Sequence, residues 1–288
     1  QHWSEHAYLA WKRHQILEAF LDRGLEVEVG ECLTSGPASR RRAVIAVQRR
    51  TGSPVAGFRE RLSHTVVEAD GCLVVTPRIR ASLPKLIKLS HLLTFGAKGA
   101  IFTVLDTETG LDVAVADAEL APERRQQAIA LSLDLGFARF SVGREIVVEA
   151  HPPVMRFGGI AVMPPPGAFI QAVAAAEEAM ARLVDEAVAA ALARRPKKAK
   201  GPARVADLFA GCGTFALRLS RRAQVHAVES DKPALEALSF AARHTQGLKT
   251  VTIEARDLYR RPMMAKELAG FDAVVFDPPR DGAAPQVK

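Results

Sequence analysis

Residues 205–215, which read VADLFAGCGTF, carry the strongest chemical signal in this sequence. Their apolar start predicts a buried strand, and Gly211, Cys212 and Gly213 then lead into a predicted helix. Glycines let the backbone approach a ligand closely, and the free amides at the start of a helix can bind that ligand. Ala216 stands where a dinucleotide-binding loop would have its third glycine, which disfavours an NAD site. The segment therefore predicts a nucleotide- or nucleoside-binding loop of a different type.

Acidic residues close four predicted strands in the last part of the chain. They are Asp207, Glu229, Asp257 and Asp277. The carboxyl ends of parallel strands meet at one edge of a sheet, and ligands of open parallel sheets bind in the crevice along that edge. Glu229 ends the second strand, where an acidic side chain can hold the two hydroxyls of a ribose. An alternative stays open for each acid, because a carboxylate at a strand end can simply cap the following helix.

The elements that must position these residues follow from the hydrophobic pattern. Beyond about residue 203 strands and helices alternate, which predicts a parallel sheet with crossover helices. An Ala-rich helix over about residues 169–194, with Val173 in its interior, and a basic connector precede this sheet. Upstream, β-branched runs between about residues 42 and 149, a hairpin at the ETG turn (108–110) and helices near 83–93 and 122–135 predict an α+β region. An amphipathic helix over about residues 5–23 opens the chain.

Five motifs together resemble the class I S-adenosylmethionine-dependent methyltransferases, and within them the RNA uracil-5-methyltransferases. In chain order they are QHWSEHAYLAWKRHQI, PPGAFIQA, DLFAGCGTF, AVESDKPALEAL and FDPPRDG. The resemblance spans nearly the whole chain. It implies an α/β fold, namely a Rossmann-like class I methyltransferase sheet without its C-terminal strands and with an inserted α+β domain. We therefore expect a fragment that is truncated at both ends.

The resemblance also implies a domain organisation. Residues 1–32 would form an N-terminal helix that packs on the catalytic domain. Residues 33–167 would form a central α+β domain that faces RNA, and residues 168–288 would form the domain that binds S-adenosylmethionine.

The resemblance further implies which residues bind S-adenosylmethionine. They are Gln171, Phe209, Gly211, Gly213, Thr214, Glu229, Asp257 and Asp277. Thr214 departs from the asparagine that is common at this place in the family, but a hydroxyl can still donate and accept hydrogen bonds. Arg280 ends the DPPR tetrapeptide, where enzymes that methylate exocyclic amines of nucleic acids typically have an aromatic residue. Because a guanidinium is no aromatic platform for a base, the motif favours methylation at carbon.

Uracil carbon 5 is a poor nucleophile, so its methylation needs a thiolate that adds at carbon 6 and a base that removes the carbon 5 proton. In the family both groups follow the fourth strand, so the resemblance places them beyond Lys288 and assigns no catalytic residue to this chain. Cys212 lies within the cofactor loop and is better explained as a small core residue. Cys72 resembles the last of four cysteines that ligate a [4Fe-4S] cluster in many family members, and a buried free cysteine is the equal alternative. Of the eight histidines only His2 and His6 stand four residues apart, and two ligands alone do not make a zinc site.

Composition limits the classes to which this protein can belong. Of its 288 residues, 48% are hydrophobic and 25% are charged, which is typical of a folded globular protein. The most apolar stretch, about residues 168–193, is interrupted by acidic residues and cannot cross a membrane at low cost. Three scattered cysteines, Cys32 among them, fit no disulfide framework, which predicts a reducing, cytoplasmic location.

Lysine and arginine outnumber aspartate and glutamate by 39 to 32, which gives a net charge of +7. RNA is the partner that the resemblance implies, ribosomal rather than transfer RNA, and we expect a monomer. The runs at residues 40–42 and 194–200 are the predicted phosphate contacts, and Arg49 and Arg50 form a further basic cluster.

The sequence thus predicts methyl transfer from S-adenosylmethionine to carbon 5 of a uridine in structured RNA, and we expect 23S rRNA. Two alternatives stay open. One is a module that binds cofactor and RNA without chemistry of its own. The other is a nucleic-acid amine methyltransferase, which would need no thiol.

Overall fold

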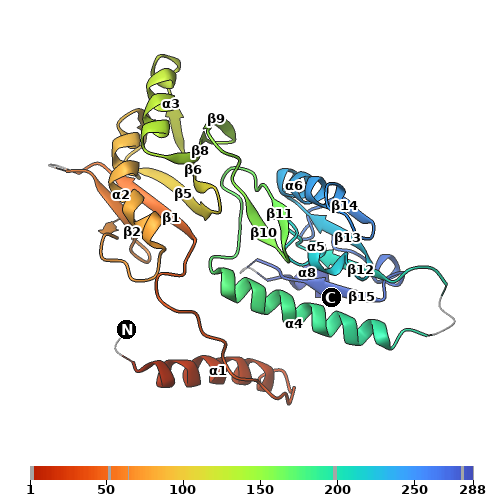
Figure 1. Ribbon diagram of the computed structural model, residues 1–288. Coiled ribbons are helices and arrows are strands. Elements are labelled where there is room, and N and C mark those ends of the chain that lie inside the picture. Colours follow the sequence, from red (N-terminus) through yellow and green to blue (C-terminus); the bar gives the residue numbers. More distant parts are fainter. Residues whose placement is uncertain (1–2, 51–52, 64, 197–199, 280–281, 288) are drawn as a thin grey trace. The chain divides into compact units, whose positions relative to one another are not determined.

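The computed structural model describes residues 3–50, 53–63, 65–196, 200–279 and 282–287 (Figure 1). It contains two compact units, Gln1–Gly36 and Pro37–Lys288. The first two residues of the N-terminal motif, Lys197 and Lys198 of the connector, and Arg280 of the DPPR motif lie outside the described residues. In the part of the chain that is described, no helix is long and apolar enough to cross a membrane.

The first unit is built around helix α1 (Glu5–Leu21), which confirms the predicted opening helix. Ser4 begins this helix, because its hydroxyl accepts the free backbone N–H of Ala7 at 3.2 Å. Cys32 donates its thiol to the carbonyl of Leu9 at 3.6 Å, so it has a local structural contact. The packing of α1 on the catalytic domain stays a prediction.

Seven strands form one sheet in the first part of the second unit. They are β1 (Arg42–Gln48), β2 (Val55–Arg59), β3 (Val66–Glu68), β5 (Ala100–Thr107), β6 (Gly110–Ala116), β8 (Phe137–Val142) and β9 (Glu145–Glu149). Their order in space is β3-β2-β1-β5-β6-β8-β9, and only β6 and β8 pair in parallel. The hairpin predicted at the ETG turn is confirmed, and Gly110 there has φ +142°, which favours glycine.

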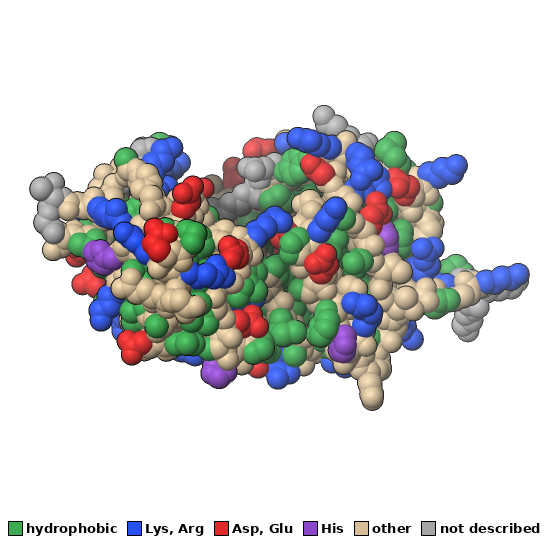
Figure 2. All heavy atoms as spheres, turned by 90° about the horizontal axis from the view of Figure 1, so that it is seen from above, with side chains coloured by type: hydrophobic (Ala, Val, Ile, Leu, Met, Phe, Trp, Pro, Cys, Tyr) green, Lys and Arg blue, Asp and Glu red, His purple; other side chains and the backbone are tan. Residues whose placement is uncertain are grey.

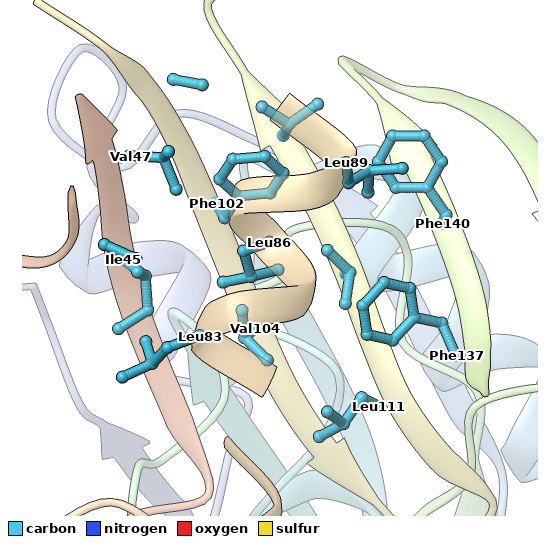
Figure 3. Close-up of a cluster of buried hydrophobic side chains, with 14 of the residues drawn as sticks. Ile45, Val47, Leu83, Leu86, Leu89, Phe102, Val104, Leu111, Phe137 and Phe140 are labelled. Atoms are coloured by element: carbon cyan, nitrogen blue, oxygen red, sulfur yellow. The ribbon is translucent and has the colours of Figure 1, made fainter. Parts of the chain in front are cut away.

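Helices α2 (Pro77–Ser90) and α3 (Arg125–Asp134) complete the apolar core of this sheet. Figure 3 shows side chains of α2 against those of the strands, among them Leu83, Leu86, Leu89, Ile45, Phe102 and Phe140. The sequence placed the start of α2 too late, at Leu83. The helix begins earlier because the hydroxyl of Thr76 accepts the N–H of Ile79 at 3.4 Å and a proline occupies the first turn.

Short elements complete this unit. Strand β4 (Leu93–Phe95) pairs with β7 (Ala118–Leu120), and the 3-10 turn η1 (Pro122–Arg124) leads into α3. Strands β10 (Met155–Phe157) and β11 (Ile160–Val162) form a hairpin whose apolar side chains lie in the core of the second sheet. The domain boundaries expected from the sequence stay predictions.

The second sheet is parallel throughout, as predicted. Its strands are β12 (Arg204–Leu208), β13 (Gln224–Glu229), β14 (Val251–Ala255) and β15 (Ala273–Phe276), in the order β14-β13-β12-β15. The helices of this region are α4 (Ala174–Ala193), α5 (Ala216–Leu219), α6 (Lys232–Arg243), α7 (Ala265–Leu268) and α8 (Ala284–Val287). Val173 is not inside the Ala-rich helix, because its backbone is extended, with φ −124° and ψ 119°. Leu208 pairs with both Val228 and Phe276, so the carboxyl ends of these strands meet at one edge.

Candidate cofactor-binding site

The loop that follows β12 has a backbone suited to the close approach of a ligand. Phe209, Gly211 and Gly213 have φ of +62°, +52° and +95°, in the left-handed region. The space beside Gly211 is open, since a Cβ there would meet no heavy atom within 4 Å. At Gly213 a Cβ would lie 2.4 Å from Cδ1 of Leu238 in α6. Gly211 therefore borders space that a ligand can occupy, whereas Gly213 fits the loop against α6.

These two glycines make a matched test of the loop. We expect Gly213→Ala to lower the free energy of unfolding by about 2–3 kcal/mol, because it adds both backbone strain and overpacking. Gly211→Ala adds the backbone strain alone, which costs about 1 kcal/mol. Urea denaturation followed by circular dichroism measures both losses. Equal losses in the two variants would contradict the packing role of Gly213.

Glu229, at the end of β13, ties this loop to the neighbouring strand. Its Oε2 accepts the backbone N–H of Gly211 at 3.1 Å. Its Oε1 accepts the N–H groups of Ser230 at 2.6 Å and of Asp231 at 3.0 Å. A carboxylate with several N–H donors is held in one orientation. Thr214 is half-buried just before α5, in the same loop.

Gln171 and Asp277 lie 106 residues apart in the chain and meet at this edge. The Nε2 of Gln171 donates to Oδ2 of Asp277 at 3.1 Å. Burial raises the pKa of Asp277, and the hydrogen bond from Gln171 opposes that rise. Two motifs from distant parts of the sequence, PPGAFIQA and FDPP, are thus brought together.

Arg41 fixes the segment that carries Gln171. Its backbone N–H donates to the carbonyl of Ala172 at 2.7 Å, and its Nε donates to the carbonyl of Gln171 at 3.3 Å. Its Nη2 lies 2.8 Å from Oε1 of Glu177 in α4, and the two side chains are only 14% and 7% exposed. Burial raises the pKa of Glu177, and the charge of Arg41 opposes that rise. Strand β1 is therefore attached to the edge that holds Asp277.

The structure corrects the role expected for the first basic run. The prediction that Arg41 contacts RNA phosphates is wrong, because its guanidinium is occupied by a buried carboxylate. Arg42 donates its Nε to the carbonyl of Ala168 at 3.0 Å, and burial lowers its pKa. In the second run Arg195 pairs with Asp272, with 3.0 Å between Nε and Oδ1. Arg41, Arg42 and Arg195 therefore stabilise the fold through contacts within the protein.

Asp257 follows β14 and caps the turn after it. Its Oδ1 accepts the N–H groups of Tyr259 at 2.9 Å and of Arg260 at 3.2 Å, which is the capping alternative that the sequence left open. The ring of Tyr259 meets that of Phe209 edge-on, with 6.5 Å between centroids, and its hydroxyl donates to the carbonyl of Gly282. Tyr259 therefore belongs to this edge, although no motif pointed to it.

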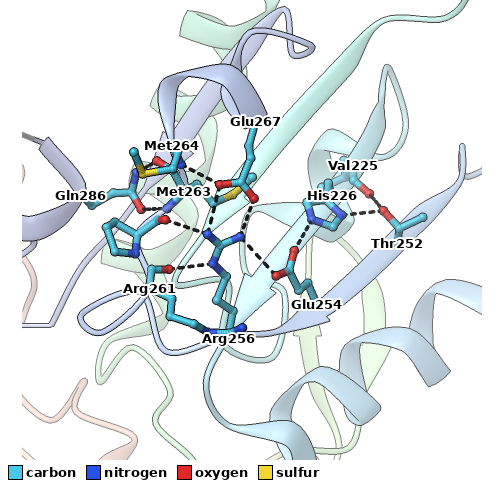
Figure 4. Close-up of polar contacts among 11 residues, drawn as sticks. Val225, His226, Thr252, Glu254, Arg256, Arg261, Met263, Met264, Glu267 and Gln286 are labelled. Carbon is cyan, nitrogen blue, oxygen red and sulfur yellow. Dashed lines mark hydrogen bonds and ion pairs between the residues drawn. The ribbon is translucent and has the colours of Figure 1, made fainter.

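Arg256 holds the segment between β14 and α7 in place (Figure 4). Its Nε donates to the carbonyl of Arg261 at 2.6 Å, and its Nη2 donates to that of Pro262 at 2.7 Å. Its Nη1 lies 2.7 Å from Oε1 of Glu267, and the hydrogen bond from Arg256 lowers the pKa of Glu267 to about 2. The sequence analysis missed this residue, because a lone arginine beside a strand carries no signal of its own.

Asp207 lies beneath the edge rather than on it, so the prediction that all four acids face the crevice is wrong for this residue. Its side chain is 0% exposed, and neither oxygen has a hydrogen-bond partner among the described residues. Burial raises the pKa of Asp207 to about 7. The amide of Ala216 approaches without good hydrogen-bond geometry and opposes the rise, and the charges of Asp277 and Glu229 add to it. The charges of Asp277 and Glu229 thus create an environment that favours a cation.

Cys212 is buried in the core of the parallel sheet, 3% exposed. Burial raises the pKa of its thiol to about 12, and the charges of Asp231 and Glu229 add to this rise. A thiol with this pKa holds almost no thiolate at neutral pH, which fits a packing role. Cys72 is half-buried against the core of the seven-stranded sheet. Within the described ranges, no three His, Cys, Asp or Glu side chains are grouped to hold a metal ion.

Comparison with known proteins adds to this geometry. A family model described as "Conserved hypothetical protein 95" matches residues 179–284. An uncharacterized RNA methyltransferase of Mesorhizobium japonicum is 44% identical over 289 residues, which cover 100% of this chain and 67% of that protein. The chain belongs to the RNA methyltransferase family. A relative with the same description from Rhizobium meliloti is 47% identical, and the chain spans 66% of its length.

Two further matches are to enzymes named for uracil. The 23S rRNA (uracil(1939)-C(5))-methyltransferase RlmD of Chromohalobacter salexigens is 31% identical over 98% of this chain and 60% of that protein. The crystal structure of Pyrococcus abyssi tRNA (uracil-54, C5)-methyltransferase in complex with S-adenosyl-L-homocysteine has a TM-score of 0.69. It is 20% identical, and the match covers 100% of this chain and 70% of that one. Membership of an RNA methyltransferase family and the Rossmann-like fold, both predicted from the five motifs, are confirmed.

Proposed function

We propose that the carboxyl edge of the parallel sheet binds S-adenosylmethionine and that the whole protein methylates carbon 5 of a uridine in structured RNA. The observation that carries this proposal is the open space at Gly211 beside the fixed carboxylate of Glu229. A ligand in that space would touch backbone on one side and a ribose-binding carboxylate on the other.

We assign the following roles to the residues expected at the site. Glu229 would bind the ribose hydroxyls, and Asp257 and Phe209 would border the adenine. Thr214 and Asp277 would lie toward the methionine part, with Gln171 orienting Asp277 through their hydrogen bond. When bound, S-adenosylmethionine supplies an activated methyl group.

Charge supports this choice of cofactor. S-adenosylmethionine carries a positive sulfonium and a positive ammonium group. The carboxylates of Asp207, Asp277 and Glu229 lie close enough together for two of them to raise the pKa of the third. A cationic ligand relieves such repulsion, whereas an anionic one increases it.

The RlmD relative supports uridine in 23S rRNA as the target, since that protein is named for this substrate. The archaeal structure is named for a tRNA uridine, but at 20% identity it supports the fold rather than the substrate. We therefore propose ribosomal RNA as the partner. RNA that contains 5-fluorouridine tests the chemistry, because only transfer to carbon 5 through a thiol adduct stalls as a covalent complex.

The burial of Cys212 favours a second candidate function for this chain taken alone. In this function the chain is a module that binds cofactor and RNA without chemistry of its own. The thiol of Cys212 is buried with a pKa of about 12, and Cys32 and Cys72 are half-buried in other parts of the fold. None of these described cysteines is placed as a nucleophile at the sheet edge. A covalent complex between this chain and 5-fluorouridine RNA would exclude this candidate.

Cys72 does not by itself fit an iron–sulfur cluster. A [4Fe-4S] cluster needs four thiolate ligands, and the described residues bring no three candidate ligands together. Its role as a ligand stays a prediction, and no step of the proposed reaction depends on it.

Calorimetric titration with S-adenosylhomocysteine tests the cofactor site. We expect Glu229→Ala to weaken binding by about 10- to 100-fold, because hydrogen bonds to a charged group contribute about 1.5–3 kcal/mol. Cys212→Ser is the control, since its side chain is buried in the core, and it should bind as the wild type does. Equal affinity of wild type and Glu229→Ala would contradict the ribose contact.

A further inference from the structure

Three arginines, two that follow β1 and one that ends β2, donate to main-chain carbonyls. Arg49 donates its Nη2 to the carbonyls of Ser90 at 3.4 Å and Leu93 at 3.1 Å, and its guanidinium lies 4.4 Å from the ring centroid of Phe95. Arg50 donates to the carbonyl of Val66, and Arg59 donates to that of Lys98 at 2.6 Å. All three arginines are exposed. Their guanidiniums are therefore fixed in place while they face solvent.

Many other arginines of this unit have their charge neutralised by a carboxylate. Those at 78, 125, 139, 156, 182, 195, 218, 222 and 256 each lie within 4 Å of a carboxylate. No described carboxylate forms such an ion pair with Arg49, Arg50 or Arg59, although Glu60 follows Arg59 in the chain. A carbonyl dipole orients a guanidinium without neutralising it. The positive charge of these three side chains is thus available to an external anion.

An open cleft lies at the same place. It is lined by Gln48, Arg49, Arg50 and Thr65 and has a volume of about 470 Å³. The amide of Gln48 and the hydroxyl of Thr65 add neutral hydrogen-bonding groups to the two cations. Figure 2 shows basic and acidic side chains interspersed over one face of the molecule.

We propose that Arg49, Arg50 and Arg59 bind the phosphate backbone of the RNA substrate, with Arg49 and Arg50 in this cleft. The inference rests on the proposed function, which supplies RNA as the partner. A planar guanidinium matches two phosphate oxygens, and the open shape of the cleft suits a polymer that passes through it. Contacts of this kind position RNA without reading its sequence.

The test measures binding of a fluorescein-labelled RNA stem–loop with uridines in its loop, by anisotropy between about 50 and 200 mM KCl. We expect the double variant Arg50→Gln/Arg59→Gln to bind about 30-fold more weakly near 0.1 M salt. The slope of log affinity against log salt should fall by about 1.5, because two phosphate contacts are lost. Arg50→Lys/Arg59→Lys keeps both charges and should retain most of the slope.

The matched control is Arg125→Gln/Arg182→Gln, which removes the same charge from two arginines that already have carboxylate partners. Its affinity should stay within about twofold of the wild type. Equal weakening in the two glutamine pairs would overturn the proposal, and so would displacement of the RNA by polyglutamate as readily as by unlabelled RNA. Circular dichroism confirms that each variant is folded.

Binding of S-adenosylhomocysteine separates this inference from the proposed function. If the cofactor analogue binds and the arginine variants keep wild-type RNA affinity, only the inference fails. If the wild type binds no RNA at all, the inference fails together with the proposed substrate, and the analogue titration still decides the cofactor site.

Discussion

Replacing Arg139 by methionine is expected to lower the free energy of unfolding by about 3–5 kcal/mol. Arg139 donates its Nε to Oδ1 of Asp112 at 2.9 Å and its Nη2 to Oδ2 at 2.7 Å, and the two side chains are 5% and 3% exposed. Its Nη2 also donates to the carbonyl of Pro164 at 2.7 Å. Burial raises the pKa of Asp112, and Arg139 opposes this rise. The variant leaves a buried carboxyl group without its partner.

Urea denaturation followed by far-ultraviolet circular dichroism measures this loss. The control is Arg125→Met, which breaks an ion pair with Glu145 whose side chains are 40% and 67% exposed. We expect it to cost at most about 1 kcal/mol. Adding Asp112→Leu to Arg139→Met should recover most of the loss, because it removes the unpaired group. A loss no larger than that of Arg125→Met would show that the buried pair contributes little.

Asp207 is expected to make the protein less stable as the pH rises from about 4 to about 7. Its pKa in the folded chain is about 7, raised from 3.8, so in this range the folded chain keeps a proton that the unfolded chain loses. Deprotonation of the unfolded chain favours unfolding. Over this window the contribution reaches about 4 kcal/mol, and it stays constant above pH 7.

The variant Asp207→Asn isolates this effect, because asparagine has nearly the same shape and does not titrate. We expect the free energies of unfolding of variant and wild type to differ little near pH 4. As the pH rises to about 7, the variant should become more stable than the wild type. Urea denaturation at a series of pH values measures this difference in the free energy of unfolding. A difference that is independent of pH would mean that Asp207 is ionised in the folded protein.

Much of the fold could be predicted from local patterns. The glycine loop, the strand that ends at Glu229 and the ETG hairpin are set by residues close together in the chain, and the structure confirms these elements. The start of α2 was missed because a hydroxyl cap and a proline outweighed the apolar spacing. Val173 was misplaced because an Ala-rich pattern does not show where the backbone becomes extended.

The errors at the site have a common cause. Whether an arginine meets phosphate or a buried carboxylate depends on which segments pack beside it, and Arg41 meets Glu177 from another part of the chain. The burial of Asp207 and the capping role of Asp257 likewise follow from packing and turn geometry. Gln171 and Asp277 could be matched from the sequence only because a family resemblance linked their motifs.

The length and position of strand β1 bear on which uridine would be methylated. Its first residue, Arg42, is hydrogen-bonded to Ala168 near the cofactor edge. Its last residue, Gln48, lines the cleft that contains Arg49 and Arg50. Seven residues of extended chain span about 20 Å. With RNA bound as proposed, the strand would hold a phosphate at a fixed distance from the transferred methyl group. A uridine would be selected by its spacing from that phosphate, so inserting or deleting nucleotides between the two should move the methylated position.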